Sequence, residues 1–385
     1  MDYLSCPTLG WLSKNRKIKK LFGLYGDLLV YEIKRIRETL QSLFKPNVNF
    51  LRYNSDTDNS QNTDIFNDSK NDVIINVSLP IGDCIAKADI LQRDGEAWKL
   101  YEVNIGIKHK TKYINALAFN AMLFEKASIK ISEIFTVHIN RAYRLGMPAA
   151  KMFSFTNCAK KVQEKMPQYI DNIEAALKEL SSQEMPPASI KRNCKNCPAF
   201  DICIGKDLSQ SLIFDMPKLS SIAAQELMDK GIRYINDIPD DFELTPMQKI
   251  AKNCVKTNTI YVSDNLKNLL ANIKPPYYYL DFESITNVIP IYRNFAPHSQ
   301  ILTQFSIDKC FDIDKVEAHY EYIADPARNC QEVIAQKLIE YFESEGSIIT
   351  YANFEKIAIK RLAALYPQYK QKLIEITDRI VDFEE

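Results

Sequence analysis

The spacing of apolar side chains predicts an α/β unit in the first half of the chain. Apolar residues recur three and four positions apart between residues 28 and 44, which is typical of an amphipathic helix. The Asp94-Gly95 step is typical of a hairpin turn between two strands. The same periodicities predict, in order, strands at 73–81, 84–92 and 97–105, a helix at 112–127, a strand at 134–140 and a helix at 159–181.

A change of pattern near Pro275-Pro276 predicts a boundary, after which a second α/β unit begins. Before this boundary, residues 54–72 form a polar run that we expect to be a loop, and residues 208–272 have a helical pattern. The second unit is predicted to contain strands at 277–285, 301–308 and 316–323, a helix at 330–344, a strand at 347–351 and a helix at 354–365.

Composition adds that the chain has enough apolar residues for two or three folded domains. It has 385 residues, of which 46% are hydrophobic and 25% charged, and this excludes a disordered, collagen-like or coiled-coil protein. Its 49 basic residues balance 49 acidic ones, so contact with nucleic acid must come from local basic clusters at 14–20, 108–112 and 191–195. The N-terminus lacks the order of a signal peptide, and no apolar run reaches the ~18 residues that span a bilayer. We therefore expect a cytoplasmic protein with no membrane partner.

Nine cysteines are unevenly placed, and three of them have the spacing Cys194-x2-Cys197-x5-Cys203. In a reducing cytoplasm, clustered thiols indicate metal or cluster ligands rather than disulfides. A CxxC turn brings two thiolates to one ion, and a third leaves a four-coordinate site one ligand short, for which Cys6 is the distant candidate. Spacing does not distinguish zinc from an iron–sulfur cluster, and three ordinary core cysteines are the alternative.

Two carboxylates, Asp281 and Glu283, lie two residues apart in a predicted strand, so both side chains project from one face. Two carboxylates within an apolar run are costly unless a positive group lies between them, and a metal ion would meet that need. Glu355, at the start of a helix that follows a strand, offers a third carboxylate. An edge strand with a solvated polar face is the alternative.

The Cys6-Pro7 start and the later cysteine triplet resemble those of the RecB-like iron–sulfur nucleases, which include the AddB helicase-nucleases and the CRISPR-associated adaptation nucleases. The resemblance implies a [4Fe–4S] cluster held by four cysteines, which would pin together the two ends of a restriction-endonuclease-like nuclease domain. The implied ligands are Cys6, Cys194, Cys197 and Cys203. The remaining cysteines have no partner pattern and are expected in the cores, namely Cys84, Cys158, Cys254, Cys310 and Cys330.

Nucleases of that class are similar in placing an Asp on one strand and a Glu-x-Lys on the next, where they bind divalent metal and activate water. Asp89 and Glu102, on either side of the predicted hairpin, match the two carboxylates. Asn104 stands where the family has lysine, which predicts an impaired first site. Lys108 or Lys110 is the alternative source of the positive charge. A plain hairpin whose acids face solvent is the other alternative.

The second acidic group resembles that of DEDD-type 3′–5′ exonucleases of the DnaQ class, which have an RNase H-like fold. The resemblance implies that Asp281, Glu283 and Glu355 bind two Mg²⁺ or Mn²⁺ ions that clamp the attacking water and the leaving oxygen. Glu355 stands where many of these exonucleases have Asp, and Tyr351 where Asn is usual. Their third motif, Tyr or His followed four residues later by Asp, has no counterpart here. Asp382 resembles a pre-helix Asp and not that missing ligand.

The order of these motifs resembles a bacterial family of uncharacterised proteins that joins a RecB-like domain to a C-terminal DnaQ-like domain. The resemblance extends over nearly all of the chain. It implies a RecB-like nuclease domain at 1–205, a helical connecting region at 206–274 and a partial RNase H-like α/β domain at 275–385. We expect a member that is truncated at its C-terminus.

Two hypotheses of function follow from these residues. The first is a metal-dependent nuclease that hydrolyses phosphodiester bonds at DNA ends, with 3′–5′ exonuclease action at the second site. The second is a catalytically inactive relative that binds nucleic acid in DNA repair or defence. The five carboxylates favour the first hypothesis, whereas Asn104 and the missing third motif favour the second.

Overall fold

The computed structural model describes Tyr3 and residues 6–15, 17–18, 24–49, 64–108, 111–188, 194, 197–204, 211–312 and 315–384. Contacts within the chain divide it into two compact units, which are described separately below. The first comprises Met1–His138 and Phe153–Tyr261, and the second comprises Ile139–Met152 and Val262–Glu385. Both contain helices and a mixed sheet, which confirms the predicted α/β class. The assignment of three domains with named folds stays a prediction.

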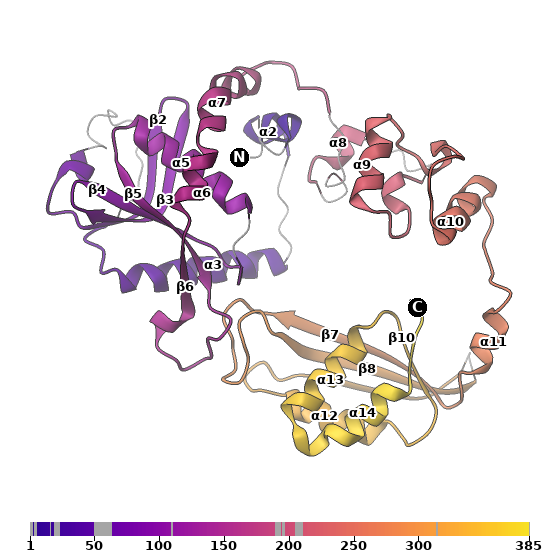
Figure 1. Ribbon diagram of the computed structural model, residues 1–385. Coiled ribbons are helices and arrows are strands. Elements are labelled where there is room, and N and C mark those ends of the chain that lie inside the picture. The colour runs from indigo at the N-terminus through magenta and orange to yellow at the C-terminus, as the bar shows by residue number, and fades with distance from the viewer. Residues whose placement is uncertain are drawn as a thin grey trace. The chain divides into compact units, whose positions relative to one another are not determined.

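The first unit is built around a six-stranded sheet whose strands lie side by side in chain order (Figure 1). The strands are β1 (Val48–Asn49), β2 (Val73–Ile81), β3 (Cys84–Asp94), β4 (Ala97–Val103), β5 (Ile131–Ile139) and β6 (Phe153–Asn157). β2, β3 and β4 form an antiparallel meander, whereas β1 runs parallel to β2 and β5 parallel to β4. Gly82 and Gly95 make the two hairpin turns at φ of 57° and 62°, a conformation that strains residues with a side chain.

Helices cover both faces of this first sheet. In Figure 1, α3 (Leu24–Leu43) lies across one face and α5 (Thr111–Lys126) packs on the other. α5 also joins β4 to β5, because parallel neighbours need a crossover connection. The prediction of one long helix at 159–181 is wrong. The segment forms α6 (Ala159–Lys165) and α7 (Pro167–Leu180), because Pro167 has no N–H to continue the first helix.

The predicted loop at 54–72 is only partly within the described residues, which resume at residue 64. Residues 64–67 form one helical turn, so the prediction of a continuous loop is wrong there. The apolar side of the turn explains the difference, because Phe66 is buried and its ring meets Trp98 edge to face at 6.0 Å.

The predicted helical region at 208–272 contains short helices around a small core of its own. α9 (Ser221–Asp229) begins after Ser220, whose hydroxyl accepts a hydrogen bond from the N–H of Ala223. α10 (Pro246–Thr257) begins with a capping box in which Thr245 and Gln248 bond to each other's backbone N–H. The buried side chains of this core are Ile213, Met216, Leu227, Ile235, Ile238 and Leu244.

The second unit contains a five-stranded sheet in the order β11-β10-β7-β8-β9. Its strands are β7 (Tyr277–Thr286), β8 (Gln300–Asp312), β9 (Lys315–Ile323), β10 (Ser347–Thr350) and β11 (Ile380–Asp382). β7, β8 and β9 are antiparallel, whereas β10 runs parallel to β7 and β11 parallel to β10. Figure 1 shows helices on one side of this sheet. They are α12 (Gln331–Tyr341), α13 (Phe354–Leu365) and α14 (Lys370–Asp378).

Side chains of β7 alternate between the helix-covered face and the open face of this sheet. Tyr278, Leu280 and Phe282 are buried in the core beneath the helices. Tyr279, Asp281 and Glu283 are exposed on the opposite face. The strand therefore places its two acids on one face, as the sequence predicts. No helix within the described parts of the chain is long and apolar enough to cross a membrane.

Candidate acidic sites and cysteine group

A pocket of about 420 Å³ lies at the carboxyl end of β10, on the open face of the second sheet. Asp281 of β7 lines it, next to Ser306 of β8 in the strand register. Glu355 reaches it from the first turn of α13 and is only 4% exposed. The Oε2 atom of Glu355 is buried without a hydrogen-bond partner among the described residues. A carboxylate oxygen held in this way is costly unless a cation or donor binds to it.

Asp382 belongs to the same group of acids. It lies on β11 opposite Thr350 of β10, and Thr350 lines the pocket. Burial raises the pKa of Glu355, the N–H of its own backbone lowers it, and the charges of Asp281 and Asp382 raise it further. The structure therefore places Asp281 and Asp382 near enough to Glu355 for their charges to act on it. The resemblance did not count Asp382 among the metal ligands, but the parallel pairing of β10 with β11 places it near Glu355.

Two other acids of the open face stand apart from Glu355. Glu283 projects from the same face as Asp281 but lies opposite Gln304, outside the lining of the pocket. Asp308 lines the pocket, but its Oδ1 atom lies 2.6 Å from Nδ1 of His319 on β9. That hydrogen bond is the main reason why the pKa of His319 is raised. Asp308 is therefore engaged by His319, whose protonated form this contact favours.

The first acidic pair, Asp89 and Glu102, also comes together. The register of β3 and β4 places them opposite each other, one step beyond the Ile90–Tyr101 pair. The Oδ2 atom of Asp89 accepts a hydrogen bond of 2.7 Å from the N–H of Val103. Asp89 is 8% exposed, so the alternative of a hairpin whose acids both face solvent is wrong.

A cation from α3, which the sequence reasoning missed, lies at this first pair. The Nε atom of Arg37 is 2.9 Å from Oδ1 of Asp89. Burial raises the pKa of Glu102 to about 8 and the charge of Asp89 adds to this, whereas Arg37 and Lys87 oppose it. No local signal in the sequence points to Arg37, because its contact with Asp89 depends on how α3 packs against the sheet.

The residues expected to replace the missing lysine lie elsewhere. Asn104 is buried, and its Nδ2 atom has no hydrogen-bond partner among the described residues. Lys108 is exposed, and Lys110 lies outside the described residues. The positive charge near Asp89 and Glu102 therefore comes from Arg37 and Lys87.

Replacing Glu102 by glutamine should flatten the pH dependence of stability of the first unit. With a folded pKa of about 8 against an ordinary 4.5, the wild-type carboxyl keeps its proton in the folded state while the unfolded chain loses it. Wild-type stability should therefore fall from pH 5 to pH 8, by up to about 1.4 kcal/mol per pH unit. Urea unfolding in EDTA, followed by the fluorescence of Trp11 and Trp98, measures this fall because both tryptophans lie in the first unit.

The control for this experiment is Glu125→Gln, which changes an exposed carboxyl on α5. That variant should retain the full loss of stability between the two pH values. Equal losses in wild type and Glu102→Gln would contradict the raised pKa.

Of the four cysteines predicted as cluster ligands, Cys6 lies near the later triplet because the N-terminal helix α2 (Pro7–Lys14) packs there. The indole Nε1 of Trp11 donates a hydrogen bond of 2.8 Å to the carbonyl of Ser182, just after α7. Trp11 and Leu12 form a small core with Ala199, against which Cys197 and Cys203 pack. Cys6 immediately precedes α2, so this contact brings it to the later triplet.

The pKa of the Cys203 thiol depends on the other three cysteines of this group. Burial raises its pKa, and the neighbouring Cys6, Cys197 and Cys194 raise it further. All nine cysteines are free thiols. As the side chains stand, the described parts of the chain hold no group of three or more His, Cys, Asp or Glu close enough for a metal ion. Of the cysteines expected in the cores, Cys158, Cys310 and Cys330 are buried, and Cys84 and Cys254 are half-buried.

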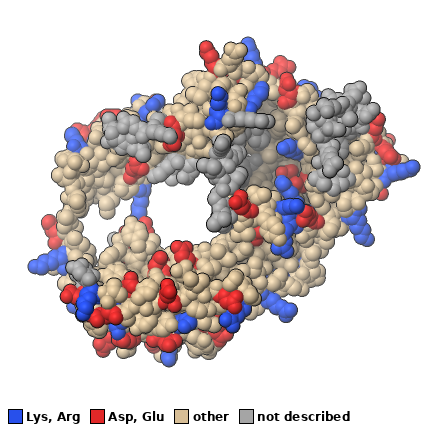
Figure 2. Space-filling view, turned by 180° about the vertical axis from the view of Figure 1, so that it is seen from behind, with Lys and Arg blue, Asp and Glu red and all other residues tan. Residues whose placement is uncertain are grey.

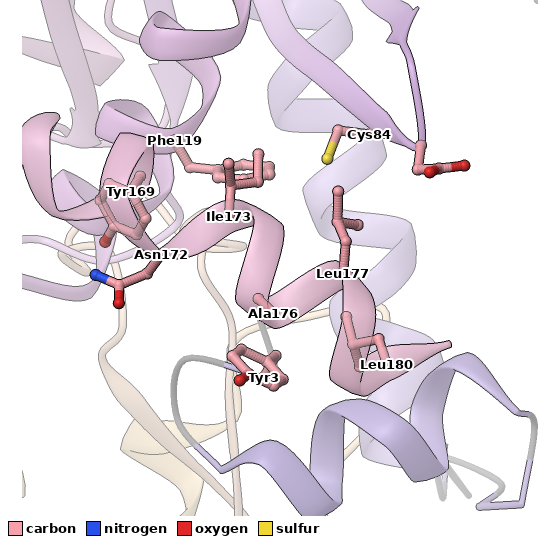
Figure 3. A pocket seen from close by; sticks show the side chains of 10 residues that line it. Tyr3, Cys84, Phe119, Tyr169, Asn172, Ile173, Ala176, Leu177 and Leu180 are labelled. Carbon is pink, nitrogen blue, oxygen red and sulfur yellow. The ribbon is translucent and has the colours of Figure 1, made fainter. Parts of the chain in front are cut away.

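A separate, mostly apolar pocket of about 210 Å³ lies between α5, α7 and the β2–β3 turn. Figure 3 shows Ile173 and Leu177 of α7 projecting towards Phe119 and Cys84, with Tyr3 below Ala176. The hydroxyl of Tyr3 donates a hydrogen bond to the carboxylate of Glu179. The pocket is lined by the packing surface that receives the N-terminal segment, and its polar groups do not converge as those of a catalytic site would.

Charge on the molecular surface is mixed. Figure 2 shows basic and acidic side chains interspersed over the displayed face. Large parts of the three predicted basic clusters lie outside the described residues. Among the described members, Lys14 and Lys108 are exposed. Nucleic-acid binding by these clusters therefore stays a prediction.

Comparisons with known proteins give matches to parts of the chain. A family model described as "Domain of unknown function (DUF2779)" matches residues 278–385, which include most of the second sheet and the acidic pocket. The chain is 32% identical over 130 residues to "Uncharacterized protein MG366" of Mycoplasma genitalium. That match covers 31% of this chain and 20% of the Mycoplasma protein, so the chain spans about one fifth of its length.

One solved structure with some likeness is the foamy viral protease-reverse transcriptase in complex with an RNA/DNA hybrid. The likeness covers 60% of this chain and 32% of the viral chain, at 12% identity and a TM-score of 0.16. A score this low carries no argument about fold or function. The joined RecB-like and DnaQ-like architecture stays a prediction.

Proposed function

We propose that this protein is a metal-dependent nuclease whose active site is the acidic pocket of the second unit. The observation that carries the proposal is the buried, unpartnered carboxylate oxygen of Glu355, which lies in a pocket beside Asp281 and Asp382. Three neighbouring carboxylates repel one another, and a bound divalent cation would offset that repulsion. Oxygen ligands of this kind suit Mg²⁺ or Mn²⁺.

The chemistry of phosphodiester hydrolysis fits this group of acids. A bound divalent cation neutralises a phosphate oxygen and lowers the pKa of a coordinated water. Asp281, Glu355 and Asp382 would hold the cation, while the position of Glu283 as a further ligand stays a prediction. The proposal is supported by the second sheet, in which β8 is antiparallel to its neighbours and β10 and β11 run parallel to β7, as an RNase H-like fold would require. DNA is the expected substrate.

The cysteine group would have a structural role in this protein. Four thiols from the start of the chain and from residues 194–203 supply the donor set of a [4Fe–4S] cluster, and zinc is the alternative. Bound there, either group would cross-link α2 and the segment that follows α7. The reaction itself would need nothing from this group.

A catalytically inactive nucleic-acid-binding protein of repair or defence is the second candidate. The contact between Arg37 and Asp89 favours it, because a guanidinium neutralises the first acidic pair without a metal ion. The same contact favours assigning any cleavage to the second unit.

Cleavage of end-labelled single-stranded DNA in Mn²⁺ or Mg²⁺ tests the proposal. Activity should disappear with EDTA and fall by about 10²–10³-fold in Asp281→Asn, because a charged group at the reacting phosphate is lost. Asp89→Asn, which changes the first pair, should keep activity within about threefold, since it leaves the transition state in the second unit untouched. Equal cleavage by wild type and Asp281→Asn would overturn the assignment.

A further inference from the structure

A partly buried ion pair closes the first acidic site of the chain. The Nε atom of Arg37 on α3 lies 2.9 Å from Oδ1 of Asp89. On the other side, the N–H of Val103 on β4 donates a hydrogen bond of 2.7 Å to Oδ2 of the same carboxylate. The Asp89 side chain is only 10% exposed. Both of its oxygen atoms therefore already have a partner within this chain.

A second polar contact holds α3 at the same place. Gln41 lies four residues after Arg37, so the two side chains project from the same side of the helix. The Nε2 atom of Gln41 donates hydrogen bonds to Oδ1 of Asn76 at 2.8 Å and to the carbonyl of Asp89 at 3.4 Å. The neighbouring Ile36 and Leu40 are fully buried. The packing of α3 thus fixes the guanidinium beside Asp89.

The groups at this place do not fit the divalent metal that the resemblance to RecB-like nucleases implies. Mg²⁺ and Mn²⁺ gather several oxygen ligands around one ion, and a cation at Asp89 would have to displace the guanidinium from Oδ1. Arg37 and Lys87 also lie near enough to Glu102, the second carboxylate, for their charges to act on its pKa. Two positive charges held there repel a further cation.

We infer that Arg37 is the resident cation of the first acidic site, where it takes the place of a divalent metal ion and fastens α3 to the sheet. Asp89 and Glu102 then form a latent metal site, which opens only when the guanidinium is removed. With Arg37 in place, the pair contributes to the packing of the first unit and binds no divalent cation. The inference does not rest on the proposed function, whose acids belong to the second unit.

Titration of the full chain with Mn²⁺, in which free Mn²⁺ is measured by its electron paramagnetic resonance signal, tests this inference. Glu355→Gln serves as the parent protein, because it weakens binding in the second unit. Addition of Arg37→Ala should raise the Mn²⁺ affinity of the first site by about tenfold or more, since a full positive charge beside the carboxylates is removed. Further addition of Asp89→Asn should abolish that gain.

Urea unfolding, followed by the fluorescence of Trp98, distinguishes a resident cation from an ordinary packing contact. Arg37→Ala should lower the urea midpoint in EDTA because it leaves Asp89 buried without its partner, and Mn²⁺ should restore part of that loss. Arg37→Lys keeps the positive charge and should not gain this response to Mn²⁺. Arg35→Ala removes an exposed arginine two residues away on α3 and should leave the midpoint and the Mn²⁺ affinity nearly unchanged.

Two outcomes would overturn the inference. One is a folded Arg37→Ala variant that gains neither Mn²⁺ affinity nor stability in Mn²⁺. The other is Mn²⁺ binding by the parent protein that Asp89→Asn weakens, because the site would then hold a metal ion with Arg37 in place. Equal Mn²⁺ binding by the parent protein with and without Asp89→Asn supports the inference. This last comparison needs no change at Arg37, so it decides the question even where Arg37→Ala fails to fold.

Discussion

Glu355→Gln is expected to reduce metal-dependent cleavage by about 10³-fold without unfolding the second unit, because one charged ligand of the cation is lost. Glutamine keeps the volume of the side chain, so the buried start of α13 stays packed. It also removes a carboxylate whose pKa is raised by burial and by Asp281 and Asp382. The metal-free variant should therefore melt at the same temperature as wild type or higher at neutral pH, where ionised Glu355 is unfavourable.

The effect of Mn²⁺ on thermal stability tests the role of Glu355 as a ligand in a second way. Mn²⁺ should raise the melting temperature of the wild type by binding the folded state, and this rise should be lost in Glu355→Gln. Glu340→Gln, an exposed change on the outer side of α12, is the matched control and should preserve both cleavage and the Mn²⁺ effect. Full cleavage by Glu355→Gln would remove the main support for the active site.

Cys203→Ser is expected to have the largest effect on the first unit. Protein purified without oxygen should be brown with a broad absorbance shoulder, and this variant should lose both the colour and the iron. Structural metal sites contribute about 10–16 kcal/mol in small metal-dependent domains, so loss of one ligand should cost several kcal/mol. The fluorescence of Trp11 should report release of α2, because its indole packs beside this cysteine.

Cys254→Ser provides the control for the cysteine group. Cys254 is half-buried on α10, away from the triplet in sequence, and its replacement should leave the iron content unchanged. A colourless wild type with one zinc per chain would contradict the cluster and retain a structural metal. A wild type with neither iron nor zinc would show that the four cysteines are ordinary thiols.

The sequence alone predicted elements whose signals are local. The Asp94-Gly95 turn is set by a glycine that tolerates positive φ, and the alternation of Tyr278 with Tyr279 follows from the period of a strand. The cysteine spacing likewise singled out four thiols that lie near one another, and their role as ligands stays a prediction. The single helix at 159–181 failed because Pro167 interrupts hydrogen bonding without disturbing the apolar periodicity.

Tertiary structure decided which acids meet and which cation lies beside them. Asp382 reaches Glu355 only because β11 pairs with β10, and Arg37 reaches Asp89 only because α3 lies across the first sheet. Residues that lie far apart in sequence become neighbours through strand register and helix packing, which local periodicity does not encode. The sequence by itself thus determined the helices, strands and reactive groups, and the tertiary structure decided how those groups combine.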